Sequence, residues 1–509
     1  MPQQVKGSGV RGQGPGARGQ RSATARCGAG MVLAGLALLV LARALLADGG
    51  VFATTPHGSP TTGLQRLTGP DYPRGSCVQC HYQHASVEGS ATGAPNPYAL
   101  FAPNDNNLCG SPGCHDGAGA DHIYQGLSDY TVSVHATDGS AVWPGPTPWA
   151  RRTGDAGKCV NCHDPHGYTD SGGLLPTLGL AREEKLCLAC HDGSPAHTNI
   201  SYELTKTYSH PVTPTSGRHS AAEGGDATRF GSGNRHAECE DCHNVHQTRH
   251  PAFPPAAPAA SDRLRGVSYV SVSNGPAWTQ PAYLFHAADD PTPIQYEYQL
   301  CFKCHSSWTT LPLTSPSGRA PTDKAKEFNP NNLSYHPMEA AGKQTAATWP
   351  ANSLLPPYTT ASILYCSDCH ASDSPAAPAG PHGSNNRFLL EANYAVVEHS
   401  PSYQSSDFAL CFRCHQEAAL LNDQDTGTND THFRFHRKHL QDAPGNQPNL
   451  PLCASCHGNS HGSTRPRLID FTREPHLTSF TSWTSKEAGA GTGQCTLTCH
   501  GEAHAGRTY

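Results

Sequence analysis

Cysteine and histidine recur along this chain in one fixed spacing. The 509 residues include 21 cysteines and 31 histidines, and eight segments read Cys-x-x-Cys-His. Two further segments end in Cys-His but have a longer spacer, with four residues between Cys109 and Cys114 and three between Cys495 and Cys499. The one cysteine outside these ten motifs is Cys27. The motif cysteines are Cys77, Cys80, Cys109, Cys114, Cys159, Cys162, Cys187, Cys190, Cys239, Cys242, Cys301, Cys304, Cys366, Cys369, Cys411, Cys414, Cys453, Cys456, Cys495 and Cys499.

The histidine that follows each second cysteine explains the spacing. Two thiols on a short turn can form thioethers to one porphyrin, and the adjacent histidine then lies under the iron as an axial ligand. Zinc sites also use paired cysteines but need no histidine after every pair, and disulfides leave the histidines unexplained. The sequence therefore predicts ten covalent haem c groups. Their predicted first ligands are His81, His115, His163, His191, His243, His305, His370, His415, His457 and His500.

Every predicted iron also has candidates for its second axial ligand. Beyond the motifs there are 21 histidines, whereas the only methionines are Met1, Met31 and Met338, and His336 lies close to the last of these. Methionine ligation raises the reduction potential of a haem, so this inventory predicts low-potential haems with two histidine ligands each. The surplus of histidines leaves the individual assignments open.

An internal repeat narrows the choice of second ligands. The motifs alternate between two kinds. The first kind has another histidine close behind it, in three cases followed by glycine, which permits a tight turn. The candidates of this type are His84, His166, His246, His382 and His461. The second kind has leucine before its first cysteine and an isolated histidine further on. The candidates of this type are His135, His210, His336 and His436.

Candidates near the two ends of the repeat stay open. His57 could ligate the first haem or reach a haem in a neighbouring molecule, and His504 and His476 compete for the last haem. The fifth pair of motifs blurs the repeat, because Leu452 precedes a motif of the first kind and Gln494 precedes the last motif.

Through these motifs and their following histidines, residues 57–504 resemble the doubled-CxxCH family of multihaem c-type cytochromes. The resemblance implies haems that stack in close pairs and pass electrons along a chain. The stretched spacers and the incomplete fifth pair depart from the family pattern, which leaves the ligation at His115 and His500 open. We expect five haem pairs, carried by residues 54–150, 151–235, 236–350, 351–445 and 446–509.

Composition indicates that haem, more than side chains, organises the fold. Only 36% of the residues are hydrophobic, and glycine and proline together occupy 94 positions. Such a chain has a thin side-chain core, and porphyrins would supply the missing apolar surface. Helical signals are short; one begins at Ser405–Asp407 and extends toward Leu421. We expect a mainly irregular, haem-packed fold with short α-helices and few or no β-strands.

The first 53 residues read as an export signal. Five basic residues and no acid precede an apolar run from Met31 to Ala47 that only Arg43 interrupts, and small residues allow cleavage after Ala53. An uncleaved membrane anchor is the alternative, although the run is short for a span. The leader contributes a net charge of +5 and the whole chain carries −6, so the remainder carries −11. This charge argues against nucleic acid as a partner.

These features predict an exported electron carrier. Ten closely spaced haems with two histidine ligands each would form a wire in the periplasm or at the outer cell surface. Other redox proteins, mainly cytochromes, are the expected partners, with extracellular metal oxides as a further acceptor. One alternative is a multihaem reductase with one open haem site, but all ten motifs keep their histidine. The other is a subunit of a cytochrome filament, in which His57 or haem edges join neighbouring molecules.

Overall fold

A computed structural model describes most of the chain after the leader. The chain divides after Gly50, and the second part, Val51–Tyr509, contains all the motifs. The predicted export signal, except for Phe52 and Ala53, and the candidate ligand His84 lie outside the described residues. The described residues are 52–66, 71–82, 86–87, 90–91, 96–111, 114–116, 130–142, 156–166, 184–212, 236–250, 256–288, 290–309, 311, 321–344, 352–398, 402–422, 433–442, 450–485 and 493–509.

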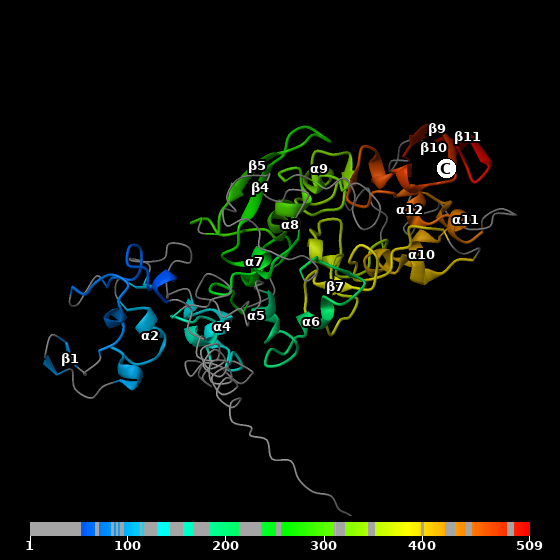
Figure 1. Ribbon diagram of the computed structural model, residues 1–509. Helices are drawn as coiled ribbons and strands as arrows, with labels where there is room; N and C mark the ends of the chain where they lie inside the picture. The colour runs from blue at the N-terminus through cyan, green and yellow to red at the C-terminus, as the bar shows by residue number, and fades with distance from the viewer. Residues whose placement is uncertain are drawn as a thin grey trace, which may run out of the picture. The chain divides into compact units, whose positions relative to one another are not determined.

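Short helices, several of which are labelled in Figure 1, make up most of the regular structure. They carry most of the motif cysteines. The α-helices are α2 (Asn106–Cys109), α4 (Val134–Thr137), α5 (Glu184–Leu188), α6 (Ile200–Glu203), α7 (Cys239–Cys242), α8 (Glu297–His305), α9 (Lys324–Phe328), α10 (Glu417–Leu420), α11 (His436–Leu440) and α12 (Cys453–Cys456). The 3₁₀ helices are η1 (Phe52–Thr54), η2 (Cys77–Gln79), η3 (Pro97–Ala99), η4 (Cys159–Asn161), η5 (Asp262–Leu264), η6 (Cys366–Asp368), η7 (Ser405–Phe408), η8 (Cys411–Arg413), η9 (Pro466–Leu468) and η10 (Phe471–Arg473).

The helix expected from Ser405 to Leu421 is broken into three short pieces, η7, η8 and α10. The motif turn causes the break. The N–H of His415 closes onto the carbonyl of Cys411, and Gln416 then adopts an extended conformation before the next helix begins. Among the described residues, no helix combines the length and hydropathy needed to span a bilayer.

The described strands pair in antiparallel fashion in small sheets. The largest sheet lies at the C-terminal end and has the order β11-β10-β9 (Figure 1). Two of the two-stranded pairs, β3–β7 and β6–β8, join segments that are far apart in the sequence. The strands are β1 (Ser86–Val87), β2 (Ser90–Ala91), β3 (Tyr208–Ser209), β4 (Tyr269–Ser273), β5 (Ala282–His286), β6 (Ser334–Tyr335), β7 (Gly383–Ser384), β8 (Gly462–Ser463), β9 (Leu477–Thr484), β10 (Gln494–Cys499) and β11 (Glu502–Thr508).

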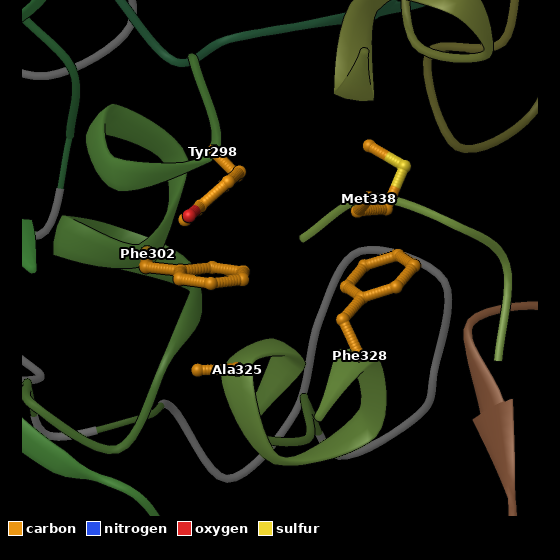
Figure 2. Packing of buried hydrophobic residues seen from close by; sticks show 5 residues of the cluster. All are labelled: Tyr298, Phe302, Ala325, Phe328 and Met338. Carbon is orange, nitrogen blue, oxygen red and sulfur yellow. The ribbon is translucent and has the colours of Figure 1, made fainter. Parts of the chain in front are cut away.

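Buried apolar side chains form several small clusters. In the cluster shown in Figure 2, Tyr298 and Phe302 of α8 pack with Ala325 and Phe328 of α9 and with Met338. Phe302 and Ala325 are almost completely buried. Met338 is therefore part of an apolar cluster. The remaining clusters around β4 and around Phe408 are similar in kind.

Candidate haem sites

Nine of the ten motifs fold into a turn or helix that brings the histidine back over the first cysteine. In eight of them the backbone N–H of the histidine donates to the carbonyl of the first cysteine at 2.8–3.0 Å. The ninth, Cys301–His305, lies wholly inside α8. Such a turn places both thiols and the imidazole close together, as attachment to one porphyrin requires. The stretched motif Cys109–His115 is one of the eight, with a distance of 3.0 Å.

The tenth motif is built differently. Cys495 and Cys499 lie on strand β10. The N–H of His500 donates to the carbonyl of His476 at 3.1 Å and does not close onto its own first cysteine. The two stretched spacers look alike in the sequence but have different structures.

One continuous cavity connects all the motifs. Its volume is about 3840 Å³, several times that of an ordinary ligand pocket of about 300–1,000 Å³. Every cysteine and histidine of the ten motifs lines it. The donor set and the size of this cavity both fit a series of covalently attached haems.

Seven motif histidines face a second imidazole across this cavity. The ring centroids of each pair are 5.9–6.3 Å apart. Two imidazoles bound on opposite sides of one metal, with bonds of roughly 2 Å, have centroids about 6 Å apart. The spacing therefore fits one iron between the two rings. The pairs are His81–His166, His115–His57, His163–His246, His191–His135, His243–His382, His305–His210 and His370–His461.

Two further motif histidines also have another histidine close by. Burial, followed by the charge of His336, lowers the pKa of His415 to about 4. Burial, followed by His457, lowers the pKa of His436 to about 3. These neighbours make His336 and His436 the candidates for the second ligands at His415 and His457.

The two rings of a pair generally come from different haem-pair segments, which we call units 1 to 5 in the order predicted above. A motif of the first kind faces a histidine of the following unit, as His81 in unit 1 faces His166 in unit 2. A motif of the second kind faces a histidine of the preceding unit, as His191 in unit 2 faces His135 in unit 1. His57 precedes the first motif and faces His115, a motif histidine of the second kind. The histidine just behind a first-kind motif thus serves the unit before it.

One hydrogen bond recurs between the two second-ligand candidates that serve the same unit. We call each such pair of histidines a clamp. Nδ1 of His57 donates to the carbonyl of Pro165, directly before His166, at 3.1 Å. Nδ1 of His210 likewise donates to the carbonyl of Pro381, directly before His382, at 2.6 Å.

The other two clamps follow the same rule. His336 donates to the carbonyl of Ser460, directly before His461. His135 lies against the carbonyl of Val245, directly before His246, without the geometry of a full hydrogen bond. A hydrogen-bonded Nδ1 fixes the ring and leaves Nε2 available for a metal.

Backbone pairing holds these clamps together. His210 directly follows β3 and His382 directly precedes β7, and the two strands are paired. The pair β6–β8 does the same for His336 and His461. In the clamp of His135 and His246, the N–H of Val134 donates to the carbonyl of Thr248 at 2.7 Å.

Close backbone approach explains the glycine after the clamp histidines. A Cβ on Gly383 would collide with the carbonyl oxygen of Glu203, and one on Gly462 with that of Glu327. The reason for glycine at these positions is thus lack of space, where the sequence had suggested a tight turn. Gly58 has the same constraint, so His57-Gly58 carries a signature that the sequence analysis missed.

Three of the first-kind motif histidines contact backbone carbonyls of residues in an unusual conformation. Nδ1 of His81 donates to the carbonyl of Tyr98 at 2.9 Å, and Nδ1 of His370 to that of Phe388 at 3.0 Å. Tyr98 and Phe388 have positive φ angles of 64° and 66°. Arg467, with φ 62°, is one of the residues that accept from His457. Non-glycine residues in this region are strained and cluster at functional sites. Nothing in the sequence marked them.

Burial keeps several of the facing imidazoles neutral. Burial, followed by the charge of the facing histidine, lowers the pKa of His163, His370 and His382 to about 4. An imidazole with this pKa is uncharged near neutral pH, and the uncharged form is the one that binds metals.

Contacts between thiols show that motifs adjacent in sequence are also adjacent in space. The first cysteine of a second-kind motif hydrogen-bonds to the first cysteine of the next motif, in the pairs Cys109–Cys159, Cys187–Cys239, Cys301–Cys366 and Cys411–Cys453. Within units, electrostatic contacts join Cys80–Cys114, Cys242–Cys304, Cys369–Cys414 and Cys456–Cys495. In the eight steps that these contacts join, the spatial order of the motifs therefore follows the sequence order.

The candidates for the last motif are arranged differently from the clamps. The ring centroid of His476 is 4.6 Å from that of His500, which is too short for an iron between them. Nε2 of His500 lies 3.2 Å from a carboxylate oxygen of Glu398. His504 faces His439 at 6.1 Å, and not His500. Both His439 and His504 line the cavity, and the sequence analysis did not single out His439.

Comparison with known proteins agrees with this site. Residues 286–466 match the family described as outer membrane cytochrome MtrC/MtrF-like, domains II/IV. Residues 154–196 match the doubled CXXCH motif family. No curated protein and no solved structure matches the chain. The motifs and the two family matches together identify the chain as an exported multihaem c-type cytochrome that carries covalently bound haem and transfers electrons.

Proposed function

We propose that the chain binds ten haem c groups and conducts electrons along them in sequence order. The observation that carries this proposal is the set of seven motif histidines that face a second imidazole at 5.9–6.3 Å along one cavity. The haem supplies the one-electron chemistry. The protein contributes thioether anchors, two neutral imidazoles for each iron and a dry surrounding that keeps the haems close together.

The axial ligands follow from the clamps. His57, His135, His210 and His336 would serve second-kind haems, and His166, His246, His382 and His461 first-kind haems. His436 is the second ligand proposed for the haem at His457. The tenth haem is proposed from the motif formed by Cys495, Cys499 and His500. We assign no second ligand to it. Filled with ten porphyrins, the chain has a haem-packed fold whose small apolar clusters complete the core.

The second imidazole at each facing pair favours a role as an electron carrier over a role as a catalyst. An iron with two histidine ligands has no position for a substrate, and this applies to each of the seven facing pairs. His57 lies against His115 of its own chain, which favours a ligand role there over a bridge to a neighbouring molecule.

We further propose that the protein works at the outer cell surface and delivers electrons to extracellular acceptors such as metal oxides. The matched outer membrane cytochrome family supports this location. Other cytochromes are the proposed electron donors. The negative charge that remains after the leader favours docking to basic patches of those partners.

Intact mass of the purified protein tests the proposal directly. We expect a mass that corresponds to ten covalent haems and to cleavage after the leader. Optical spectra should show low-spin haems, and a redox titration should show low reduction potentials. A colourless chain, or one with only a few haems, contradicts the proposal. A high-spin haem in the wild-type protein instead favours a reductase.

A further inference from the structure

We infer that the haems form two electronic classes that alternate along the chain, distinguished by the angle between their two imidazole planes. This inference rests on the proposed ligation and adds to it. In the four described first-kind pairs the planes are close to parallel, at 14°, 16°, 22° and 21°. In the three described second-kind pairs they cross steeply, at 61°, 63° and 61°. The two sets of angles do not overlap.

The clamps account for the difference between the classes. A ring bound through Nε2 can still rotate about its bond to the metal, and a hydrogen bond at Nδ1 stops that rotation. In two of the three described second-kind pairs the incoming ligand has this anchor, as His210 has at the carbonyl of Pro381. In three of the four described first-kind pairs the motif histidine has it, as His370 has at the carbonyl of Phe388. The two kinds of haem are therefore anchored on opposite faces by different carbonyls.

The plane angle changes the electronic structure of a ferric iron. Each imidazole π orbital overlaps with the iron dπ orbital perpendicular to the ring plane. Parallel rings raise the same dπ orbital and split the pair, which gives a rhombic low-spin spectrum. Crossed rings raise both orbitals almost equally, which gives a strongly anisotropic spectrum with a large maximum g value.

The same splitting predicts an alternation in reduction potential. A ferric ion has one vacancy in these orbitals and is stabilised when they split, whereas a ferrous ion fills them and gains nothing. Haems with parallel rings should therefore have lower potentials than haems with crossed rings in comparable surroundings. An electron that moves along the chain would meet the two classes in turn.

Electron paramagnetic resonance of the oxidised full-length protein tests the inference without any substitution. We expect both signal types, in comparable amounts, because the described pairs divide four to three. A spectrum with only one of the two types overturns the inference. Spectra with ten low-spin haems of a single type would leave the proposed ligation standing, so the two failures are distinguishable.

A matched pair of variants assigns the signals. His210 and His382 flank the same strand pair but face different haems, at His305 and His243. His382→Ala should convert one haem to high spin and remove one haem from the rhombic signal. His210→Ala should also produce one high-spin haem but remove one from the strongly anisotropic signal.

The outcomes of these variants separate the two proposals. Loss from the same signal in both variants overturns the two-class inference. Absence of any high-spin haem in both overturns the ligand assignment, and with it the inference. Haem number by intact mass should stay unchanged, because the thioethers are untouched. If either variant fails to fold, His336→Ala and His461→Ala, at the clamp of β6 and β8, are measured in place of the first two variants. The wild-type spectrum tests the two-class inference without any variant.

Discussion

The two stretched motifs differ in structure although their sequences depart from the standard spacing in similar ways. The segment from Cys109 to Cys114 begins in α2, which Asp105 caps by accepting from the N–H of Asn107, and it closes onto the carbonyl of Cys109. The segment from Cys495 to Cys499 is part of a strand in a three-stranded sheet. The first segment closes a turn onto its own first cysteine, whereas the second is an irregular strand with register shifts between Cys495 and Leu497 and between Thr498 and Cys499.

The surroundings of the two motifs also differ, since only the first motif contacts a clamp. His115 faces His57, and the thiol of Cys109 hydrogen-bonds to that of Cys159, so this motif is joined to its neighbours on both sides. His500 instead lies beside Glu398, away from a clamp. The comparison indicates that a candidate haem site in this chain needs the turn and a facing histidine distant in the sequence, and not the spacing alone.

The largest expected effect comes from haem removal. A chain produced without the haem-attachment machinery should fail to form a compact state, because the cavity of about 3840 Å³ would remain unfilled and the apolar clusters around it are small. Limited proteolysis should cut units 1 to 4 rapidly and the sheet β9–β11 last. A protease-resistant apoprotein would contradict this prediction.

Removal of the cysteines sharpens the comparison between the two motifs. Cys109→Ala with Cys114→Ala should remove one haem and lower the free energy of unfolding by about 3–5 kcal/mol, as for the loss of a large buried group. Cys495→Ala with Cys499→Ala should cost about 1 kcal/mol, because this motif lies outside the clamps. Intact mass and denaturant unfolding measure both effects. Equal losses of stability would show that the two motifs are equally integrated.

A methyl group in a clamp should have an intermediate effect. Gly383→Ala places a Cβ against the carbonyl of Glu203, so we expect a loss of about 1–3 kcal/mol and partial conversion of haem to high spin. Gly342→Ala is the matched control, since no atom lies within 4 Å of its Cβ position. Thermal unfolding and optical spectra of the two variants provide the readout. A harmless Gly383→Ala would mean that the clamp tolerates separation of its strands.

The smallest effect on stability is expected from the candidate second ligands. His57→Ala should convert one haem to high spin, because the ring faces His115 at a distance that fits an iron. His476→Ala should leave the spin state of every haem unchanged, because its ring is too close to that of His500. Room-temperature optical spectra distinguish the two results. A new high-spin band in the His476 variant would assign this histidine to the tenth haem after all.

Several features of the site could be read from the sequence. The thiols and the first ligand of each motif are local, within a few residues, so spacing alone identifies them. The two kinds of motif, and the histidines that follow them, were also visible as a repeat. The identification as a multihaem c-type cytochrome is confirmed by the two family matches. The number of haems and each second ligand stay predictions.

Partner assignment was beyond the reach of the sequence for a physical reason. The two rings of a facing pair lie far apart in the sequence, from 56 residues for His135 and His191 to 139 residues for His243 and His382. With more spare histidines than irons, spacing gives no basis for a choice among them. The strained residues Tyr98 and Phe388 were equally invisible, because ordinary side chains occupy a conformation that usually favours glycine.

By itself, the sequence determined the chemistry of this protein: paired thiols with an adjacent histidine specify haem attachment through covalent bonds between near neighbours. Only the tertiary structure decided which distant histidine faces each motif, in what spatial order the motifs follow, and at what angle the rings meet. These properties depend on strand pairing and hydrogen bonds between segments that are distant in the sequence. The same local pattern could therefore become a clamped site at Cys109 and a strand at Cys495.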